Sequence, residues 1–145
     1  MIRAATDSDL GAVQTMALRF IASTDYQHRL AFSTAHVEAF VQQTIENPHA
    51  VVLVSEHKGQ LVGMMAVVLF IHPLTGERTA SEMAWWMDPA HRGGRDAIRM
   101  LSEAEQWAMG QGAVMFHMIA PDERTAEFYE RLDYRKIETS YGRRL

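Results

Sequence analysis

The segment from Trp86 to Ile98 holds residues whose types and spacing could do chemistry. An apolar run ends at Asp88-Pro89, a loop with the adjacent glycines Gly93 and Gly94 follows, and a helical pattern then begins. The first amides of a helix lack internal partners and carry partial positive charge, so they favour a phosphate group. Arg92 adds a guanidinium that matches phosphate oxygens. The segment predicts a phosphate-bearing ligand at the start of this helix; an ordinary strand-to-helix turn with steric glycines is the alternative.

Six strands and four helices are expected around this loop. Apolar residues recur at helical spacing within residues 10–20, 37–45, 98–108 and 126–132, whereas residues 20–33 fit a loop or a broken helix. Strand patterns cover residues 1–5, 50–55, 60–71, 81–87, 113–119 and, as one or two strands, 134–145. This order predicts a single α/β domain over residues 1–145, with a mixed, largely antiparallel central sheet flanked by helices.

The composition narrows the class of protein. The 145 residues are 48% hydrophobic and 22% charged, and no apolar run reaches the roughly 18–20 residues of a membrane span. Because no export signal is recognised, we expect a cytoplasmic protein. The absence of cysteine excludes disulfides, thiolate metal sites and a cysteine nucleophile. The net charge of −4 argues against broad nucleic-acid binding, and the seven histidines lack the spacing of metal ligands.

Two motifs stand at the start of the 98–108 helix and at the end of the last helix. In the first, a strand that ends near Pro89 runs into a segment with Arg92 in its first place and Ala97 in its last. The second reads Phe-Tyr-Glu-Arg-Leu-Asp-Tyr over residues 128–134. These segments resemble the Arg/Gln-x-x-Gly-x-Gly/Ala and Phe-Tyr-Glu-x-Leu-Gly-Phe/Tyr motifs of the GNAT superfamily of acyl-CoA-dependent N-acetyltransferases. The order of the expected elements is similar to that family over nearly the whole chain.

The resemblance implies that acetyl-CoA is the co-substrate, and the spacing of the histidines predicts that no metal takes part. The backbone from Trp86 to Asp88 would pair with the pantetheine arm, the loop amides would hold the pyrophosphate, and the chain around Ile119 would form the other side of a V-shaped slot. The implied cofactor-binding residues are Trp86, Met87, Asp88, Arg92, Gly93, Gly94, Arg95, Asp96, Ala97, Ile119 and Asp122.

The resemblance also implies roles in catalysis. Tyr129 would protonate the departing CoA thiolate, since a phenol with a pKa near 10 keeps its proton at neutral pH. Glu82 would deprotonate the amine, directly or through water, with a pKa raised by burial. His117 is a rival base because it lies mid-strand beside the slot. The Met87 amide would stabilise the oxyanion. Purely structural roles, a packed tyrosine ring and an exposed strand-end carboxylate, are the alternatives.

Two positions depart from the family pattern. Arg95 stands where the family has an internal glycine, and Asp133 replaces the glycine after the late helix. The leading hypothesis is an N-acetyltransferase that acetylates a primary amine of a small molecule or a protein, by direct attack in a ternary complex. Dimerisation is common in the family, so a homodimer is allowed. The competing hypothesis is a binding or structural protein of the same fold with a degenerate cofactor loop and little or no catalysis.

Overall fold

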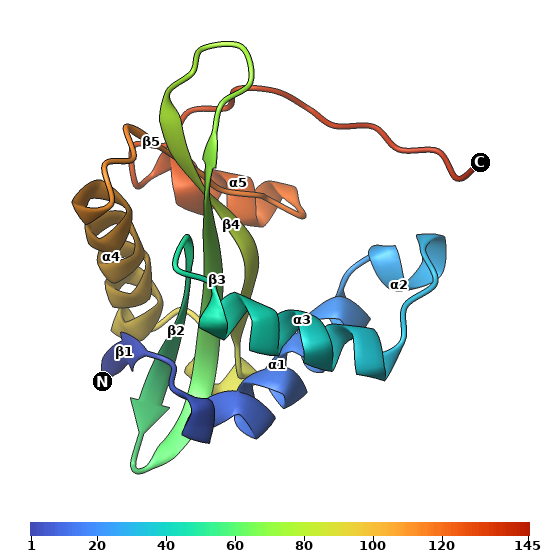
Figure 1. The fold of residues 1–145 in the computed structure, drawn as a ribbon, viewed down its shortest axis with the longest axis vertical. Helices are drawn as coiled ribbons and strands as arrows, with labels where there is room; N and C mark the ends of the chain where they lie inside the picture. The colour runs from blue at the N-terminus through green and yellow to red at the C-terminus, as the bar shows by residue number, and fades with distance from the viewer.

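A five-stranded sheet forms the centre of the molecule (Figure 1). The computed structural model of the protein describes all residues from 1 to 145. The strands lie side by side in chain order: β1 (Ile2–Ala4), β2 (Ala50–His57), β3 (Gln60–Ile71), β4 (Arg78–Met87) and β5 (Met115–His117). The neighbouring pairs among β1 to β4 are antiparallel, and β5 runs parallel to β4. The predicted α/β fold with a mixed, largely antiparallel sheet is therefore confirmed.

Helices cover both faces of this sheet. The elements are η1 (Asp7–Asp9), α1 (Leu10–Ser23), α2 (Tyr26–Arg29), α3 (Thr34–Glu46), η2 (Pro89–His91), α4 (Arg95–Gly110) and α5 (Glu123–Glu130). On one face, Val13 and Met16 of α1 and Val41 of α3 pack on the sheet. On the other face, α4 buries Met100 and Ala104 against it. No helix has the length and apolar character that crossing a bilayer would require.

Local signals in the sequence explain where the helices and turns begin. The Ser33 hydroxyl accepts a hydrogen bond of 3.1 Å from the His36 amide and caps α3, and the Asp122 carboxylate accepts one of 2.8 Å from the Thr125 amide and caps α5. Lys58 and Gly59 both have positive φ, at 51° and 78°, so they form a tight two-residue turn between β2 and β3. Residues 20–33, which the sequence left open, form the end of α1, the single-turn α2 and a linker.

The strands expected over residues 134–145 are absent, and β5 is shorter than expected. No residue from 135 to 145 belongs to a strand or makes a backbone–backbone hydrogen bond. A strand exists only where a neighbour pairs with its backbone, and this segment leaves the sheet rather than joining it (Figure 1). The 113–119 strand shrinks to Met115–His117 because the Ile119 backbone bonds to side chains instead.

Gly63 on β3 lets β4 pack closely. A Cβ at this position would lie 2.2 Å from Sδ of Met87 and 3.1 Å from the carbonyl oxygen of Trp86. The missing side chain therefore leaves room for the buried Met87 thioether, directly opposite Gly63 in the register of the two strands.

Candidate active site

The sheet opens between β4 and β5. Their pairing ends at Ser81 and His117, whereas β4 continues to Met87. The Asp88 amide donates to the carbonyl oxygen of Val62 on β3, at 2.8 Å. Because backbone groups alternate in direction along a strand, the N–H and C=O of Met87 point away from β3, toward the open side. The backbone of Met87 therefore makes no hydrogen bond to β3.

Glu82 and Tyr129 meet at the point where the strands separate. The Ile119 amide donates to Oε2 of Glu82 at 3.3 Å, and the Tyr129 hydroxyl donates to the carbonyl oxygen of Ile119 at 3.3 Å. The Glu82 and Tyr129 residues are only 4% and 6% exposed. The predicted base and the predicted acid thus come together from β4 and α5 around one residue.

Burial sets the protonation of both groups. It raises the pKa of Glu82 to about 7, and the hydrogen bond from the Ile119 amide opposes part of this rise. Burial, and then the nearby charge of Glu82, raises the pKa of Tyr129 above its usual range. Near neutral pH, Glu82 can therefore accept a proton and Tyr129 can donate one.

A β-bulge determines which face of the sheet Glu82 occupies. Ala66 pairs with Ala84, but the next residue, Val67, pairs with Glu82, so Met83 is an extra residue on β4. Met83 and Ala84 both pack on the face of α1 and α3, whereas Trp85 packs on the face of α4. Glu82 and Trp85 therefore share a face although they are three residues apart, a separation that would place them on opposite faces of a regular strand.

Trp85 fixes the position of the Tyr129 ring. The two rings are stacked, with centroids 6.3 Å apart and planes 7° apart, while Phe128 and Tyr134 contact Tyr129 from other sides. The Trp85 indole N–H is buried and has no hydrogen-bond partner in the structure. Sequence reasoning assigned no specific role to Trp85, because only the bulge and α5 bring it to this side.

The predicted phosphate loop has the backbone geometry of an anion site. Gly93 has a φ of +71°, Gly94 precedes α4 without a side-chain cap, and Arg95 is the exposed first residue of the helix. The amides of Arg95, Asp96 and Ala97 therefore lie in the first turn, where no intrahelical acceptor is available. The left-handed conformation that favours glycine occurs at Gly93 and not at Arg95. The arginine at position 95 is therefore compatible with the backbone of this loop.

The Arg92 side chain contacts two residues at the end of β4. Its Nε donates to the carbonyl oxygen of Met87 at 2.9 Å, and its guanidinium lies 4.8 Å above the Trp86 ring. Asp88 accepts from the Trp86 indole at 3.0 Å and pairs with Arg19 of α1 at 3.2 Å. Arg92 thus holds the loop against β4, and the role expected for it in phosphate binding stays a prediction. The sequence analysis missed Arg19, because no spacing links it to Asp88.

Asp122 and His117 make no hydrogen bond to Glu82 or Tyr129. Asp122 is occupied as the cap of α5. His117 lies on the side of the sheet opposite to Phe116, which packs with the α4 cluster, and its ring is 5.9 Å from that of Phe70. Its Nε2 is buried without a partner. His117 therefore faces the side of α1 and α3, away from Tyr129.

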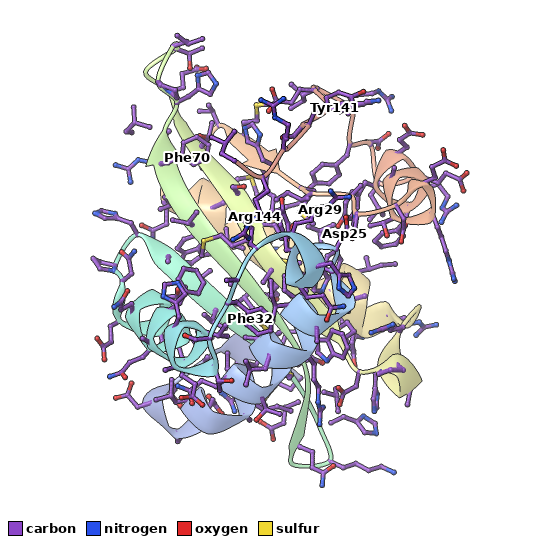
Figure 2. The ribbon with its side chains drawn as sticks, turned by 90° about the vertical axis from the view of Figure 1, so that its right-hand side faces the viewer. Asp25, Arg29, Phe32, Phe70, Tyr141 and Arg144 are labelled. Carbon is purple, nitrogen blue, oxygen red and sulfur yellow. The ribbon has the colours of Figure 1, made fainter.

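The residues near the end of the chain lie beside α2. Figure 2 shows Phe70 on the sheet, Arg29 on α2, and Tyr141 and Arg144 on the extended segment in front of it. Arg144 donates to the carbonyl oxygen of Arg29 at 2.9 Å, and the Arg29 side chain pairs with Asp25. These contacts join α2 to the last residues of the chain.

Residues 16–134 match the family model described as Acetyltransferase (GNAT) family. The fold is similar to AAC(6')-Iy in complex with the bisubstrate analogue CoA-S-monomethyl-acetylneamine, with a TM-score of 0.83 and 12% identity over 100% of this chain and 97% of that one. It is also similar to a predicted acetyltransferase with acetyl-CoA from Clostridium acetobutylicum, with a TM-score of 0.82 and 15% identity over 99% and 95% of the two chains.

A third similar structure is the ribosomal-protein-alanine N-acetyltransferase from Brucella melitensis biovar Abortus 2308. Its TM-score is 0.76, with 17% identity over 100% of this chain and 98% of that one. At these identities the similarity concerns the fold. No curated protein sequence matches the chain.

Proposed function

Because the chain belongs to the Acetyltransferase (GNAT) family, we propose that it is a cytoplasmic acyltransferase that moves the acetyl group of acetyl-CoA to a primary amine. The observation that carries this proposal is the meeting of Glu82 and Tyr129 at Ile119, where β4 and β5 separate. The chain has no cysteine to carry an acyl group, so we propose direct attack in a ternary complex.

The open side of β4 and the start of α4 would hold acetyl-CoA. The carbonyl oxygen of Met87 faces the slot and would accept from an amide of the pantetheine arm, which leaves the Met87 N–H free to face the thioester oxygen. The first-turn amides of α4 would bind the pyrophosphate. Since Arg92 already uses the Met87 carbonyl, it either shares this acceptor or moves when the pantetheine arm pairs.

The two titratable groups would divide the proton transfers. Glu82 accepts a proton from the ammonium form of the acceptor. The neutral nitrogen then bonds to the thioester carbon and loses its surplus proton to solvent. The Met87 amide stabilises the negative charge on the carbonyl oxygen. As the carbon–sulfur bond breaks, Tyr129 donates its proton to the sulfur and regains one from solvent, and Glu82 releases its proton to solvent.

His117 is the competing base in this proposal. Its buried Nε2 lacks a partner, but it lies on the opposite side of the sheet from Tyr129. We favour Glu82 because it shares a backbone contact with Tyr129. The acceptor is proposed only as the amine of a small molecule or a protein. The proposed reaction uses residues of one chain and no metal ion.

Acetyl-CoA binding by isothermal titration calorimetry tests the proposal, with the wild type compared with Arg95→Gly. We expect micromolar binding by the wild type and little change in the variant, because Arg95 is exposed and α4 begins normally at this residue. Binding only by the Arg95→Gly variant would favour the competing hypothesis of a binding or structural protein. Binding by neither would overturn the assignment of acetyl transfer to this chain.

A further inference from the structure

The helices α1 and α3 leave one face of the sheet uncovered at the end where β3 and β4 extend past them (Figure 1). Leu69, Ala80 and Phe116 pack on the side of α4, so the residues before and after each of them point to the side of α1 and α3. Two rows of these side chains cross β3, β4 and β5 in register: Phe70, Thr79 and Met115, and then Val68, Ser81 and His117. Phe70 and Met115 are 37% and 42% exposed, so the helices do not cover them.

The side chains of these two rows make an apolar and aromatic surface without formal charge. The two hydroxyls already donate to backbone carbonyl groups, that of Thr79 at 3.2 Å and that of Ser81 at 3.1 Å. The rings of Phe70 and His117 lie 5.9 Å apart with their planes at 52°, and Nε2 of His117 is buried without a partner. The other four residues are here called the sheet-end patch: Val68, Phe70, Met115 and His117.

The sheet-end patch adjoins the place where β4 and β5 separate, since His117 belongs to the last pair of these strands. Glu82 follows that pair on β4, and its side chain lies on the opposite face of the sheet. On that face the Tyr129 ring is packed against the rings of Trp85 and Phe128. An acceptor can therefore place its nitrogen in the gap and the group that carries this nitrogen on the patch, as exposed apolar surface beside a reactive group is typical of ligand sites.

The charges on this side of the sheet favour an acceptor with one cationic group. α1, α2 and the linker to α3, residues 10–33, contain one acidic residue, Asp25, and it pairs with Arg29. Asp88 at the end of β4 pairs with Arg19 of α1. A polycationic acceptor needs carboxylates for each further positive charge, whereas these two are already paired with arginines of the same chain.

We propose that the acceptor is a primary amine joined to an aromatic ring by a short alkyl chain, with the ring on the sheet-end patch. This inference deepens the proposed function and rests on it. The acceptor ring makes tilted contacts with Phe70 and His117, as aromatic rings prefer, and apolar contacts with Val68 and Met115. The acetyl group passes from the sulfur of acetyl-CoA to the nitrogen, which gives free CoA and the N-acetylated amine.

Steady-state kinetics with three acceptors tests this choice: 2-phenylethylamine, spermidine and a peptide with an N-terminal alanine. Release of the CoA thiol measures each rate, and we expect kcat/KM to be about tenfold higher for 2-phenylethylamine than for the others. Phe70→Ala should lower this kcat/KM about tenfold, chiefly through a higher KM, because the ring loses its apolar contact. Phe70→Leu keeps most of the apolar area and should lower it less.

Ile71→Ala is the matched control for these variants. Ile71 follows Phe70 on β3 and is 57% exposed, but its side chain points to the opposite face of the sheet. Its replacement should leave the kinetics with 2-phenylethylamine unchanged. A higher kcat/KM for spermidine or for the peptide would overturn the inference, and so would Phe70→Ala and Phe70→Leu variants that equal the wild type.

Calorimetry without turnover separates this inference from the proposed function. 2-Phenylethylamine is titrated into the protein saturated with CoA, which carries no acetyl group, or into the protein alone if CoA does not bind. Binding that weakens about tenfold in Phe70→Ala, without acetylation when acetyl-CoA is supplied, would support the patch and contradict acetyl transfer. Acetylation with binding that Phe70→Ala does not alter would support acetyl transfer and overturn the patch. No binding of 2-phenylethylamine in either titration would also overturn the patch.

Discussion

Glu82 and Tyr129 contact the two backbone polar groups of the same residue. The carboxylate of Glu82 accepts from the Ile119 amide, and the hydroxyl of Tyr129 donates to the Ile119 carbonyl, both at 3.3 Å. The proposed base and acid thereby contact the N–H and the C=O of one residue, which belong to the two peptide units that flank its Cα, and no hydrogen bond joins the two side chains directly. This arrangement keeps the two groups separate, so that a substrate could come between them.

Replacement of Glu82 by Gln should remove the base and keep the shape of the site. We expect kcat/KM for an amine acceptor to fall about 100-fold near pH 8. The wild-type rate should rise with pH and level off above a pKa of about 7, the value for buried Glu82. The Gln variant should lack this rise. A His117→Gln variant is the control, and a rise that disappears there but persists in Glu82→Gln would assign the base to His117.

The same substitution should change how stability depends on pH. Burial raises the pKa of Glu82 from an ordinary 4.5 to about 7, so the folded state holds its proton more tightly than the unfolded state does. The wild type is therefore relatively most stable below pH 4.5 and loses stability as pH rises to about 7. The loss is roughly 3 kcal/mol.

Gln does not titrate, so the Glu82→Gln variant should not lose this stability. Between pH 4.5 and pH 8, its free energy of unfolding should therefore rise relative to that of the wild type by roughly 3 kcal/mol. Urea denaturation at several pH values measures the difference. A constant difference across this range would show that Glu82 is not desolvated.

Tyr129→Phe should separate chemistry from packing. The ring still stacks on Trp85, while the proton for the CoA thiolate is lost. We expect kcat to fall about 100-fold with the KM for acetyl-CoA nearly unchanged. The loss of one long hydrogen bond to Ile119 should cost about 1 kcal/mol of stability or less. Tyr134→Phe is the matched control, since that hydroxyl bonds to Glu105, and equal losses of kcat in both variants would argue against a donor role for Tyr129.

Arg92→Lys should weaken acetyl-CoA binding although the charge is kept. Lysine cannot reproduce both the bond from Nε to the Met87 carbonyl and the flat contact with Trp86. The loop before α4 would then have to be ordered by the ligand, and we expect the calorimetric Kd to rise about tenfold. Arg124→Lys, on exposed α5, should leave the Kd unchanged. An unaltered Kd in Arg92→Lys would mean that the loop is held by its backbone alone.

Much of the fold follows from signals that are local in the sequence. Ser33 and Asp122 are residues typical of helix N-caps, and each caps a helix in the structure. Lys58-Gly59 is typical of a tight turn between two strands, and it forms one. The family motif around Arg92 correctly indicated the GNAT family. These signals succeed because each concerns hydrogen bonds or dihedral angles within a few residues.

The remaining features depend on partners distant in sequence. Strict alternation back from Trp85 would place Glu82 on the wrong face, because nothing in the sequence marks Met83 as an extra residue. The residues after Tyr134 alternate as in a strand, but they form none because no other strand pairs with their backbone. The alternation by itself does not show whether such a partner is present. The sequence did not indicate the contacts of Arg92 with Trp86 and Met87, because they form only when the loop turns back on β4.

A mutation at Gly63 can disturb the proposed cofactor slot, although Gly63 itself does not line the slot. Any side chain there would press on the Met87 thioether and the Trp86 carbonyl, and so shift the strand that is proposed to grip the pantetheine arm. A map of inactivating mutations would therefore not coincide with a map of ligand contacts. The map of inactivating mutations would include Gly63 on β3, which contacts no ligand but leaves space for the Met87 side chain.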